Sequence, residues 1–349
     1  MKNKILAILC ALAVTGSMIG CGSEAVQPNE STSDKEQTET PAANETEESG
    51  QEEGSKEEAK ALSEISIGVS FGQNVHPFFV AMQKGIEKAC EDYGIEKYNF
   101  LAADSSLETQ TSQIENLVTM GCDVILLNPY DSEGVVNAVA EAQKSNIGVF
   151  TMDIDCEGST AFVASNNYKV GQMLAEYVIE QLGGEGKIAI IDGITVTSLK
   201  DRTEGFMETI KTSNIEIVAE QQTAHARDTA LASAENIIQA NPDIDAFVGV
   251  NENSGMAILS AVTSANLSDV LITTVDATAE NMVAIRDGKV AAGVSQDPYM
   301  MGYQAVEQAI AWCNGEPVEE FIEVPVEYMT IDNIQQFIDR EVGYGVEVE

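Results

Sequence analysis

Hydrophobic positions from residue 64 onward follow two alternating patterns. Short apolar runs rich in β-branched residues, typical of buried strands, occur at ISIGVSF, DVILLN, IGVFTMD, KIAIIDG, AFVGVN and VLITTVD. Between these runs, apolar residues recur every three or four positions, as in helices with one buried face. This alternation predicts an α/β fold with parallel sheets, and the length of the alternating region favours two domains.

The first helix is expected to begin at Pro77, because proline at the first helical position costs no hydrogen bond. Its apolar stripe consists of Phe79, Met82, Ile86, Ala89 and Tyr93. Phe79 is therefore expected at the edge of the core. Phe78 lies about 100° around the helix, at the mouth of the turn that precedes it. Further helices are expected over residues 168–182 and 229–240.

Several predicted strands end in a polar residue. These residues are Asn128, Asp153, Asn251, Asp276 and Gln296. In parallel sheets, ligands bind beyond the carboxyl ends of the strands. Any one of these residues could equally be a turn or cap residue, but five in comparable places favour a shared polar site.

The N-terminal segment differs in composition from the rest. Residues 1–20 have a short basic start and an apolar run, as in a signal peptide. Met18-Ile19-Gly20-Cys21 resembles a bacterial lipobox, with Met where Leu is usual, and predicts a lipid on Cys21. The alternative is an ordinary secretory signal with a chance cysteine. We expect an exported protein that is lipid-anchored to the outer face of the cell membrane.

Residues 21–63 are rich in Ser, Thr, Glu, Gln and Asn, so they are expected to form a disordered acidic tether. An acidic interaction tail is the alternative. The net charge of −39 argues against nucleic acid and against adhesion of the protein surface to anionic lipid. Contact with the membrane is thus expected through the lipid only.

Four further cysteines, Cys90, Cys122, Cys156 and Cys313, are widely spaced and form no CxxC motif. Their spacing leaves open whether any of them pair. Cys90 and Cys122 lie in apolar surroundings, which is typical of small buried side chains.

Catalytic chemistry has little support. The chain has two histidines, His76 and His225, and no His-based metal motif or nucleophile elbow, so no catalytic residue, metal or cofactor is expected. A glycosidase with paired carboxylates is not excluded by composition. The polar residues and aromatic rings instead suit a neutral polyhydroxylated ligand, with Arg202 and Arg227 available to balance Asp153 and Asp276.

Eight stretches appear in the order and spacing of one known family. They are VSFGQNVHPFFVAMQKG, DVILLNPYDSEGV, FTMD, FVASNNYKVGQ, DRTEGF, AFVGVNEN, VDAT and AAGVSQDP. Over residues 64–328 the chain resembles the periplasmic sugar-binding proteins of the ribose-binding type, the substrate-binding components of ABC transporters. The resemblance implies the type I periplasmic binding protein fold, with two doubly wound parallel-sheet lobes joined by a hinge of three crossings.

The resemblance also implies boundaries. The N-terminal lobe would comprise residues 64–165 and 297–327, and the C-terminal lobe residues 166–296 and 328–349. The hinge would lie at Ser165, Asn166, Asp297 and Glu327.

The ligand-binding positions that the resemblance implies come from both lobes. They are His76, Phe78, Phe79, Asn128, Asp153, Arg202, His225, Arg227, Asn251, Asp276 and Gln296. Phe78 and His76 are expected to face the ligand most directly. For Arg227, an exposed charge at a helix start is an equally good interpretation.

Three departures from the family bear on the ligand. Ile154 follows Asp153, where the ribose binder has an arginine. His76 stands where asparagine is usual, and His225 replaces an aromatic residue. Because the arginine is missing, assignment to ribose is weakened, and the sugar stays open.

We expect a monomeric solute-binding lipoprotein that captures a monosaccharide between its lobes and delivers it to an ABC transporter permease. The alternative is a lipoprotein that senses a sugar or a furanosyl autoinducer and reports to a membrane sensor kinase. A LacI-type repressor shares the fold but needs an N-terminal DNA-binding domain, where this chain has a signal peptide and acidic tether.

Overall fold

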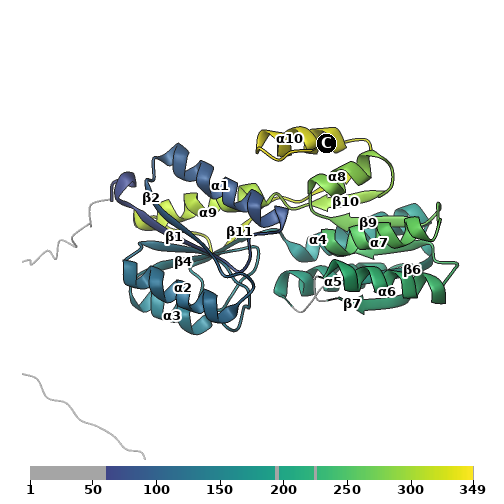
Figure 1. The fold of residues 1–349 in the computed structure, drawn as a ribbon, viewed down its shortest axis with the longest axis horizontal. Coiled ribbons are helices and arrows are strands. Elements are labelled where there is room, and N and C mark those ends of the chain that lie inside the picture. Colours follow the sequence, from purple (N-terminus) through teal and green to yellow (C-terminus); the bar gives the residue numbers. More distant parts are fainter. Residues whose placement is uncertain (1–59, 193–195, 224–225, 349) are drawn as a thin grey trace, which may run out of the picture. The chain divides into compact units, whose positions relative to one another are not determined.

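The computed structural model describes residues 60–192, 196–223 and 226–348. The expected signal peptide, Cys21, most of the tether and His225 lie outside these residues. Two six-stranded sheets, each flanked by helices, make up the described chain (Figure 1).

The first sheet has the strand order β11-β5-β4-β3-β1-β2, and all its strand pairs are parallel. Its strands are β1 (Ser66–Phe71), β2 (Lys97–Ala102), β3 (Val124–Asn128), β4 (Gly148–Met152), β5 (Ala161–Ala164) and β11 (Phe321–Glu323). The helices that pack on it are α1 (Pro77–Tyr93), α2 (Leu107–Met120), α3 (Val136–Lys144) and α9 (Pro298–Cys313). We call this sheet and its helices the first lobe.

The second sheet has the order β12-β10-β9-β8-β6-β7, and only β12 runs antiparallel to its neighbour. Its strands are β6 (Glu185–Asp192), β7 (Asn214–Gln222), β8 (Ala246–Gly249), β9 (Leu271–Val275), β10 (Ala292–Ser295) and β12 (Glu327–Thr330). Its helices are α4 (Asn167–Leu182), α5 (Thr197–Ile210), α6 (Arg227–Ala240), α7 (Glu252–Ser264), α8 (Ala279–Arg286) and α10 (Ile334–Gly343). This is the second lobe.

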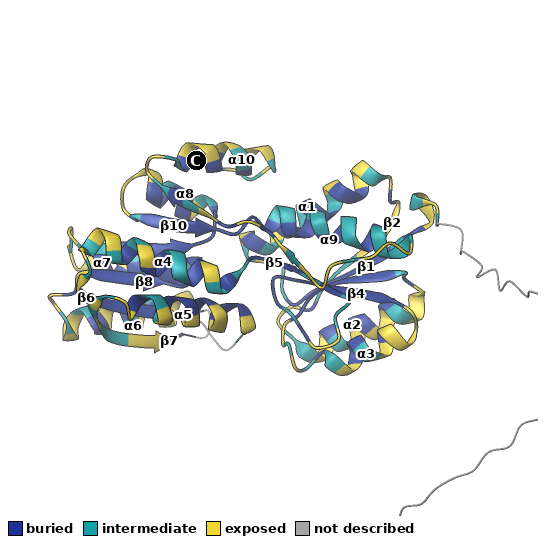
Figure 2. Cartoon of the chain, turned by 180° about the vertical axis from the view of Figure 1, so that it is seen from behind, coloured by how far each residue is buried: buried dark blue, intermediate teal, exposed yellow. Residues whose placement is uncertain are grey.

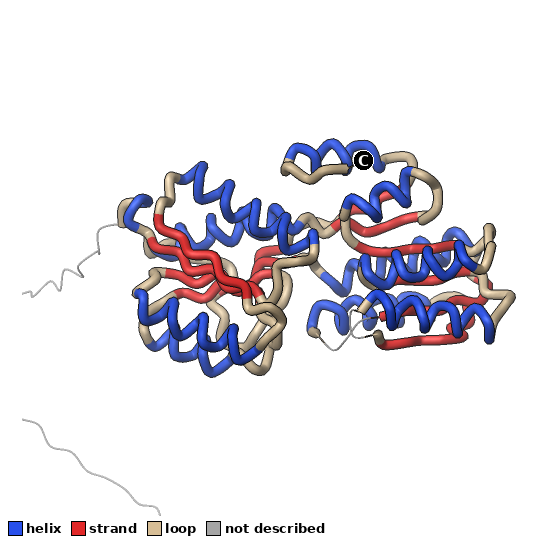
Figure 3. The backbone as a smooth tube through the Cα atoms, viewed as in Figure 1, coloured by secondary structure: helices blue, strands red, loops and turns tan. Residues whose placement is uncertain are grey.

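Both faces of each sheet are covered, which explains why the central strands are apolar without alternation. In β3, Val124 and Leu126 pack with α1 and α9, whereas Ile125 and Leu127 pack with α2 and α3. The central strands β1, β3, β4, β8, β9 and β10 are accordingly almost entirely buried, whereas the edge strands β2, β7 and β11 carry exposed residues, as do the outer faces of the helices (Figure 2). A parallel sheet with helices on both faces is a doubly wound α/β layer (Figure 3).

Each lobe contains one pair of helices in close contact through glycines. A Cβ atom at Gly171 of α4 would lie 1.8 Å from the carbonyl oxygen of Arg202 in α5. A Cβ atom at Gly85 of α1 would lie 1.9 Å from the carbonyl oxygen of Tyr299 in α9. Only glycine allows these backbones to approach so closely.

The chain passes between the sheets after β5, after β10 and between β11 and β12. Ser165 in the first crossing donates a hydrogen bond to the carbonyl oxygen of Gln296 in the second, at 3.2 Å. Asn166 caps α4 and Asp297 caps α9. Glu327 is already the first residue of β12 in the second sheet, one position earlier than the expected boundary.

The cysteines that the structure describes, Cys90, Cys122, Cys156 and Cys313, are free thiols, and the first three are buried. Across the described ranges, none of the helices is both long and apolar enough to cross a bilayer.

Candidate functional site

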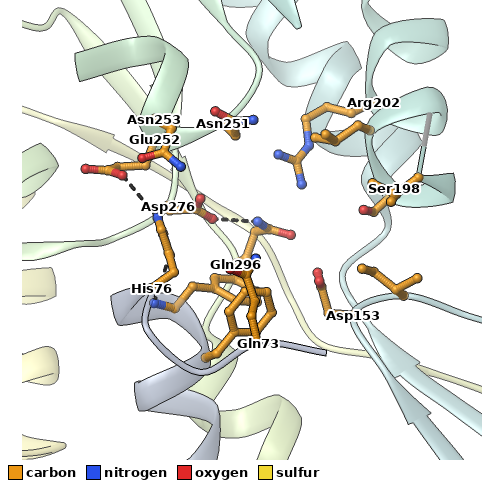
Figure 4. A pocket seen from close by; sticks show the side chains of 15 residues that line it. Gln73, His76, Asp153, Ser198, Arg202, Asn251, Glu252, Asn253, Asp276 and Gln296 are labelled. Atoms are coloured by element: carbon orange, nitrogen blue, oxygen red, sulfur yellow. Dashed lines mark hydrogen bonds and ion pairs between the residues drawn. The ribbon is translucent and has the colours of Figure 1, made fainter. Parts of the chain in front are cut away.

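A pocket of about 120 Å³ lies at the carboxyl ends of strands from both sheets (Figure 4). The first lobe contributes Gln73, His76, Phe78, Phe79, Asp153 and Ile154. The second lobe contributes Val196, Ser198, Leu199, Arg202, Asn251, Glu252, Asn253 and Asp276, and Gln296 comes from the second crossing. The volume is many times the roughly 10–15 Å³ that one water requires, so the pocket has room for a small organic molecule.

Two aspartates occupy equivalent places in the two lobes. Asp153 directly follows β4 and Asp276 directly follows β9. Both have left-handed backbone conformations, with φ of 63° and 79°. Such a conformation costs a residue other than glycine on the order of 1 kcal/mol, and this kind of strain concentrates at functional sites. In each case the strain directs a carboxylate away from the strand and into the pocket (Figure 4).

Asp276 is held by its neighbours. The Gln296 side-chain amide donates to one Asp276 carboxylate oxygen at 2.6 Å, and Asn281 donates to the Asp276 backbone carbonyl at 2.6 Å. The Gln296 Oε1 atom is buried, and no group among the described residues donates to it. A buried acceptor of this kind is suited to a hydroxyl donor from a ligand.

Arg202 is the deepest charged group in the pocket, with 2% of its surface exposed. Its Nε and Nη2 atoms donate to Asn167 Oδ1 at 3.2 and 2.5 Å, and Nη1 donates to the carbonyl oxygen of Val250. Burial lowers the pKa of Arg202, while the charges of Asp276 and Asp153 oppose this shift. The guanidinium is thus fixed by neutral acceptors and faces the two aspartates without a direct ion pair.

Burial raises the pKa of Asp153 to about 7, because Arg202 compensates the loss of water only in part and Asp276 adds repulsion. A carboxylate that is costly to ionise in the empty pocket gains from any ligand group that donates hydrogen bonds to it. The site therefore favours a ligand with several hydroxyl groups at this end.

His76 connects the two lobes, because it lies in the first lobe and its ring contacts Glu252 of the second lobe. It precedes α1 as its N-cap, and its Nδ1 atom accepts the backbone N–H of Phe78 at 3.2 Å. Nδ1 is therefore unprotonated, and the proton lies on Nε2, which is 3.2 Å from Glu252 Oε2. Burial lowers the pKa of His76, but the hydrogen bond and charge of Glu252, together with Asp276, outweigh it and the net shift is upward.

The other carboxylate oxygen of Glu252 lies near the guanidinium of Arg227. Arg227 Nη2 lies 3.5 Å from Glu252 Oε1 and 2.8 Å from Glu280 Oε2. Arg227 itself does not line the pocket. Its place is behind Glu252, where it compensates the buried carboxylate.

Most of the residues expected from the sequence line the pocket. They are His76, Phe78, Phe79, Asp153, Arg202, Asn251, Asp276 and Gln296. Asn128 does not, although it ends β3 as expected. It is 1% exposed and donates from its side chain to the carbonyl oxygen of Met152 at 2.9 Å, so it ties β3 to the residue before Asp153.

Phe78 lies deeper in the first lobe than expected. Phe78 is buried in the core of the first lobe with Met82 and Ile86, and Phe79 is only partly buried. Their rings meet edge to face at 5.4 Å. The expectation that Phe78 is the more open ring was therefore wrong, because the buried face of α1 is centred on Phe78, Met82, Gly85 and Ala89. Phe79 packs against the edge of this core, as expected.

Four further polar residues line the pocket that no sequence pattern had singled out, namely Glu252, Asn253, Gln73 and Ser198. A signal was present for two of them, because Asn251-Glu252-Asn253 is an uninterrupted polar triplet just after β8. Nothing in the described chain forms a cluster of side chains suited to a metal ion.

Comparison with known proteins agrees with this architecture. Residues 67–317 match the periplasmic binding protein domain. The ribose import binding protein of Bacillus subtilis is 32% identical over 76% of this chain and 88% of its own. The D-allose-binding periplasmic protein of Escherichia coli is 31% identical over 65% of this chain and 78% of its own.

Solved structures are similar over the same region. A solute-binding protein from Bacillus halodurans with bound myo-inositol is 28% identical, with a TM-score of 0.73, and the match covers 79% of this chain and 98% of that one. A solute-binding protein from Agrobacterium vitis with bound D-fucose is also 28% identical, with a TM-score of 0.73 over 78% and 97% of the chains. These relatives are binding proteins and not enzymes. The fold, the pocket at the strand ends and the extent of the match together show that this chain belongs to the periplasmic binding protein family, among the sugar-binding proteins of the ribose-binding type.

Proposed function

We propose that this protein is an exported lipoprotein that captures a monosaccharide in the pocket between its lobes and delivers it to an ABC transporter permease. The observation that carries the proposal is the lining of the pocket. Planar hydrogen-bonding groups from Asp153, Arg202, Asp276 and Gln296 surround a small cavity that is bounded on one side by the rings of Phe78 and Phe79. Such groups suit adjacent hydroxyls and the apolar face of a sugar ring.

The mechanism follows from the origin of these groups in two lobes. A ligand that bonds to both lobes stabilises the conformation in which the lobes face each other, through motion at the crossings. The lobes would comprise residues 64–165 with 297–327 and residues 166–296 with 328–349. Ser165, Asn166, Asp297 and Glu327 would act as hinge residues.

The N-terminal segment would export the protein and attach it to the membrane. Cys21 would carry the lipid, and residues 22–63 would separate the lobes from the membrane. The relatives are periplasmic or import binding proteins, which supports export.

Isothermal titration calorimetry with a panel of neutral ligands tests the binding proposal. The panel should contain D-ribose, D-allose, D-arabinose, D-fucose and myo-inositol, because solved or curated relatives carry or are named for them. We expect at least one to bind wild-type protein and to lose binding in Asp276→Ala. If no member binds more tightly than about 1 mM, the proposal of a neutral sugar ligand is wrong.

Uptake of the binding sugar by cells with and without the gene tests the transport role. Loss of uptake on deletion supports delivery to a permease. Normal uptake despite tight binding would favour the sensing alternative.

A further inference from the structure

The C-terminal segment reaches the hinge from outside the pocket. α10 follows β12, and its residues Ile334, Phe337 and Ile338 are buried in the core of the second lobe. The segment from Ile334 to Gly345, which we call the C-terminal strap, is thus anchored in that lobe. Its opposite face turns toward the crossings.

Arg340 on this face joins two crossings. Its Nη2 atom donates to Ser295 Oγ at 2.7 Å, and its Nη1 atom lies 3.5 Å from Asp297 Oδ2 and 3.3 Å from Glu327 Oε1. Ser295 and Asp297 flank Gln296 of the pocket. One guanidinium therefore connects the last helix to the second crossing and to the start of β12, where the third crossing ends.

The end of the strap contacts the first lobe. The ring of Tyr344 stacks on Tyr299 of α9, with ring centres 3.8 Å apart and planes at 3°. The Tyr344 hydroxyl lies 3.5 Å from Asp297 Oδ2. On the adjacent helix α1, Lys84 donates to the carbonyl oxygen of Gly345. The strap thus spans both lobes without touching the pocket.

Asp297 is the residue on which these contacts converge. It has a left-handed backbone with φ of 54°, and its carboxylate caps α9 by accepting the Met300 N–H at 3.1 Å. A left-handed conformation outside glycine persists only where the surroundings hold it. Arg340 and Tyr344 are the groups that hold this carboxylate from the side of the strap.

We propose that Arg340 is a positioning residue for ligand binding, and that the C-terminal strap stabilises the conformation in which both halves of the pocket face each other. This inference rests on the proposed function, because it concerns how the same pocket is assembled. Arg340 acts through Asp297 and Glu327, and its side chain contacts none of the residues that line the pocket. A strap that only stabilised the second lobe would need neither the Tyr299 stack nor the two crossing contacts.

Hydrogen–deuterium exchange of the full chain without ligand tests the inference independently of any sugar. In Arg340→Gln we expect peptides covering residues 295–301 and 324–330 to exchange about fivefold faster or more, while peptides from β3 and β8 stay unchanged. Arg340→Lys retains the positive charge but not the forked guanidinium group, so its exchange rates should lie between those of wild type and Arg340→Gln. Arg286→Gln, which removes an arginine that pairs with the adjacent Asp287, is the matched control and should behave as wild type.

Calorimetry with a panel sugar that binds wild-type protein provides the second test. Arg340→Gln and Tyr344→Ala should each raise its Kd about fivefold or more, with partial recovery in Arg340→Lys. Hinge peptides that exchange at the wild-type rate in Arg340→Gln would overturn the inference, and so would Kd values that match the Arg286→Gln control. Failure of every sugar to bind wild-type protein would instead count against the proposed function, and the exchange result would still decide the role of Arg340.

Discussion

Asp153 shows at the scale of one residue how binding and stability oppose each other in this pocket. Its backbone is strained, and its carboxylate is buried, with none of the described residues donating a hydrogen bond to it. Both features lower the stability of the ligand-free protein. A ligand with hydroxyl groups relieves the second of them, which makes the residue useful for binding.

Asp153→Asn is expected to stabilise the ligand-free protein at pH 8 and to abolish sugar binding. The pKa of Asp153 is raised to about 7 from an ordinary 3.8, so the folded state binds the proton more tightly than the unfolded state. Wild-type stability from this group is therefore lost as pH rises from about 4 to 7. We expect a gain of about 1 kcal/mol or more at pH 8 that shrinks toward pH 4.

Urea unfolding at several pH values measures this gain. Asp332→Asn, at an exposed aspartate in the turn before α10, is the control and should follow the wild-type curve. Equal stabilities of Asp153→Asn and wild type at pH 8 would show that the carboxylate is not costly where it lies.

His76 offers a second prediction at this scale. Its contact with Glu252 raises the pKa of the imidazole, against the effect of burial. Glu252→Gln should therefore lower the pKa of His76 by removing that charge, and it should not unfold α1, because Nδ1 still caps Phe78. NMR titration can follow the signal, since the chain has only two histidines, and His76→Gln identifies it.

A matched variant makes this titration decisive. Glu280→Gln removes a carboxylate that contacts Arg227 but not His76, so the pKa of His76 should change less than in Glu252→Gln. An unchanged pKa in Glu252→Gln would mean that the two side chains are not in contact in solution.

At the scale of elements, the glycine contacts set how the helices on each sheet are placed. Arg202 lies on α5, and α5 is held against α4 at Gly171, where a Cβ atom would meet the Arg202 carbonyl oxygen at 1.8 Å. The position of a binding side chain thus depends on a backbone contact between α5 and α4, and Asn167 of α4 also accepts hydrogen bonds from the Arg202 guanidinium.

Gly171→Ala should destabilise the protein by about 1–3 kcal/mol, as overpacking of a filled core does. It should also weaken sugar binding, because α5 must move away. Gly343→Ala in α10 is the control: no atom lies within 4 Å of its added Cβ, so stability should stay the same or rise slightly. Denaturant midpoints and Kd values of both variants check the prediction. A Gly171→Ala protein as stable as wild type would show that the helices can separate at little cost.

The two lobes also differ in how their strands end. β3 and β4 are tied together by Asn128, and β9 is tied to the second crossing by Gln296 and Asp276. A strand-end polar residue therefore serves either the ligand or the neighbouring strand, and only the side-chain partner distinguishes the two uses.

At the scale of the whole molecule, attachment to the membrane should depend on Cys21 alone. Cys21 follows an apolar run in a segment that resembles a lipobox, and the protein is strongly acidic, so an acyl anchor is the proposed attachment. Each buried methylene contributes about 0.8 kcal/mol, and two or more chains anchor stably. Cys21→Ser should shift the protein from the membrane fraction to the soluble fraction of cells.

Cys313→Ser is the matched control for this fractionation, since Cys313 is a partly buried thiol in α9 and should leave the distribution unchanged. Retention of Cys21→Ser protein in membranes would contradict lipid anchoring at this residue.

Much of the architecture was predictable, because strand and helix periodicities are local properties of the chain. The strands ending near Asn128, Asp153 and Asp276 were located to within about one or two residues. Eight of the eleven residues expected at the site line the pocket in the structure. The depth of the phenylalanines was not predictable, since it depends on the angle at which α1 meets its sheet.

The sequence by itself determined the α/β class, the elements and a set of polar strand ends, because these follow from residue spacing and from the direction of parallel strands. The tertiary structure decided which polar residues serve the pocket. It turned Asn128 toward Met152, placed Arg227 behind Glu252, and brought Arg340 to the hinge although it follows Asp297 by more than forty residues. The physical reason is that such contacts join residues distant in the chain, and their partners are set by packing and by compensation of buried charge.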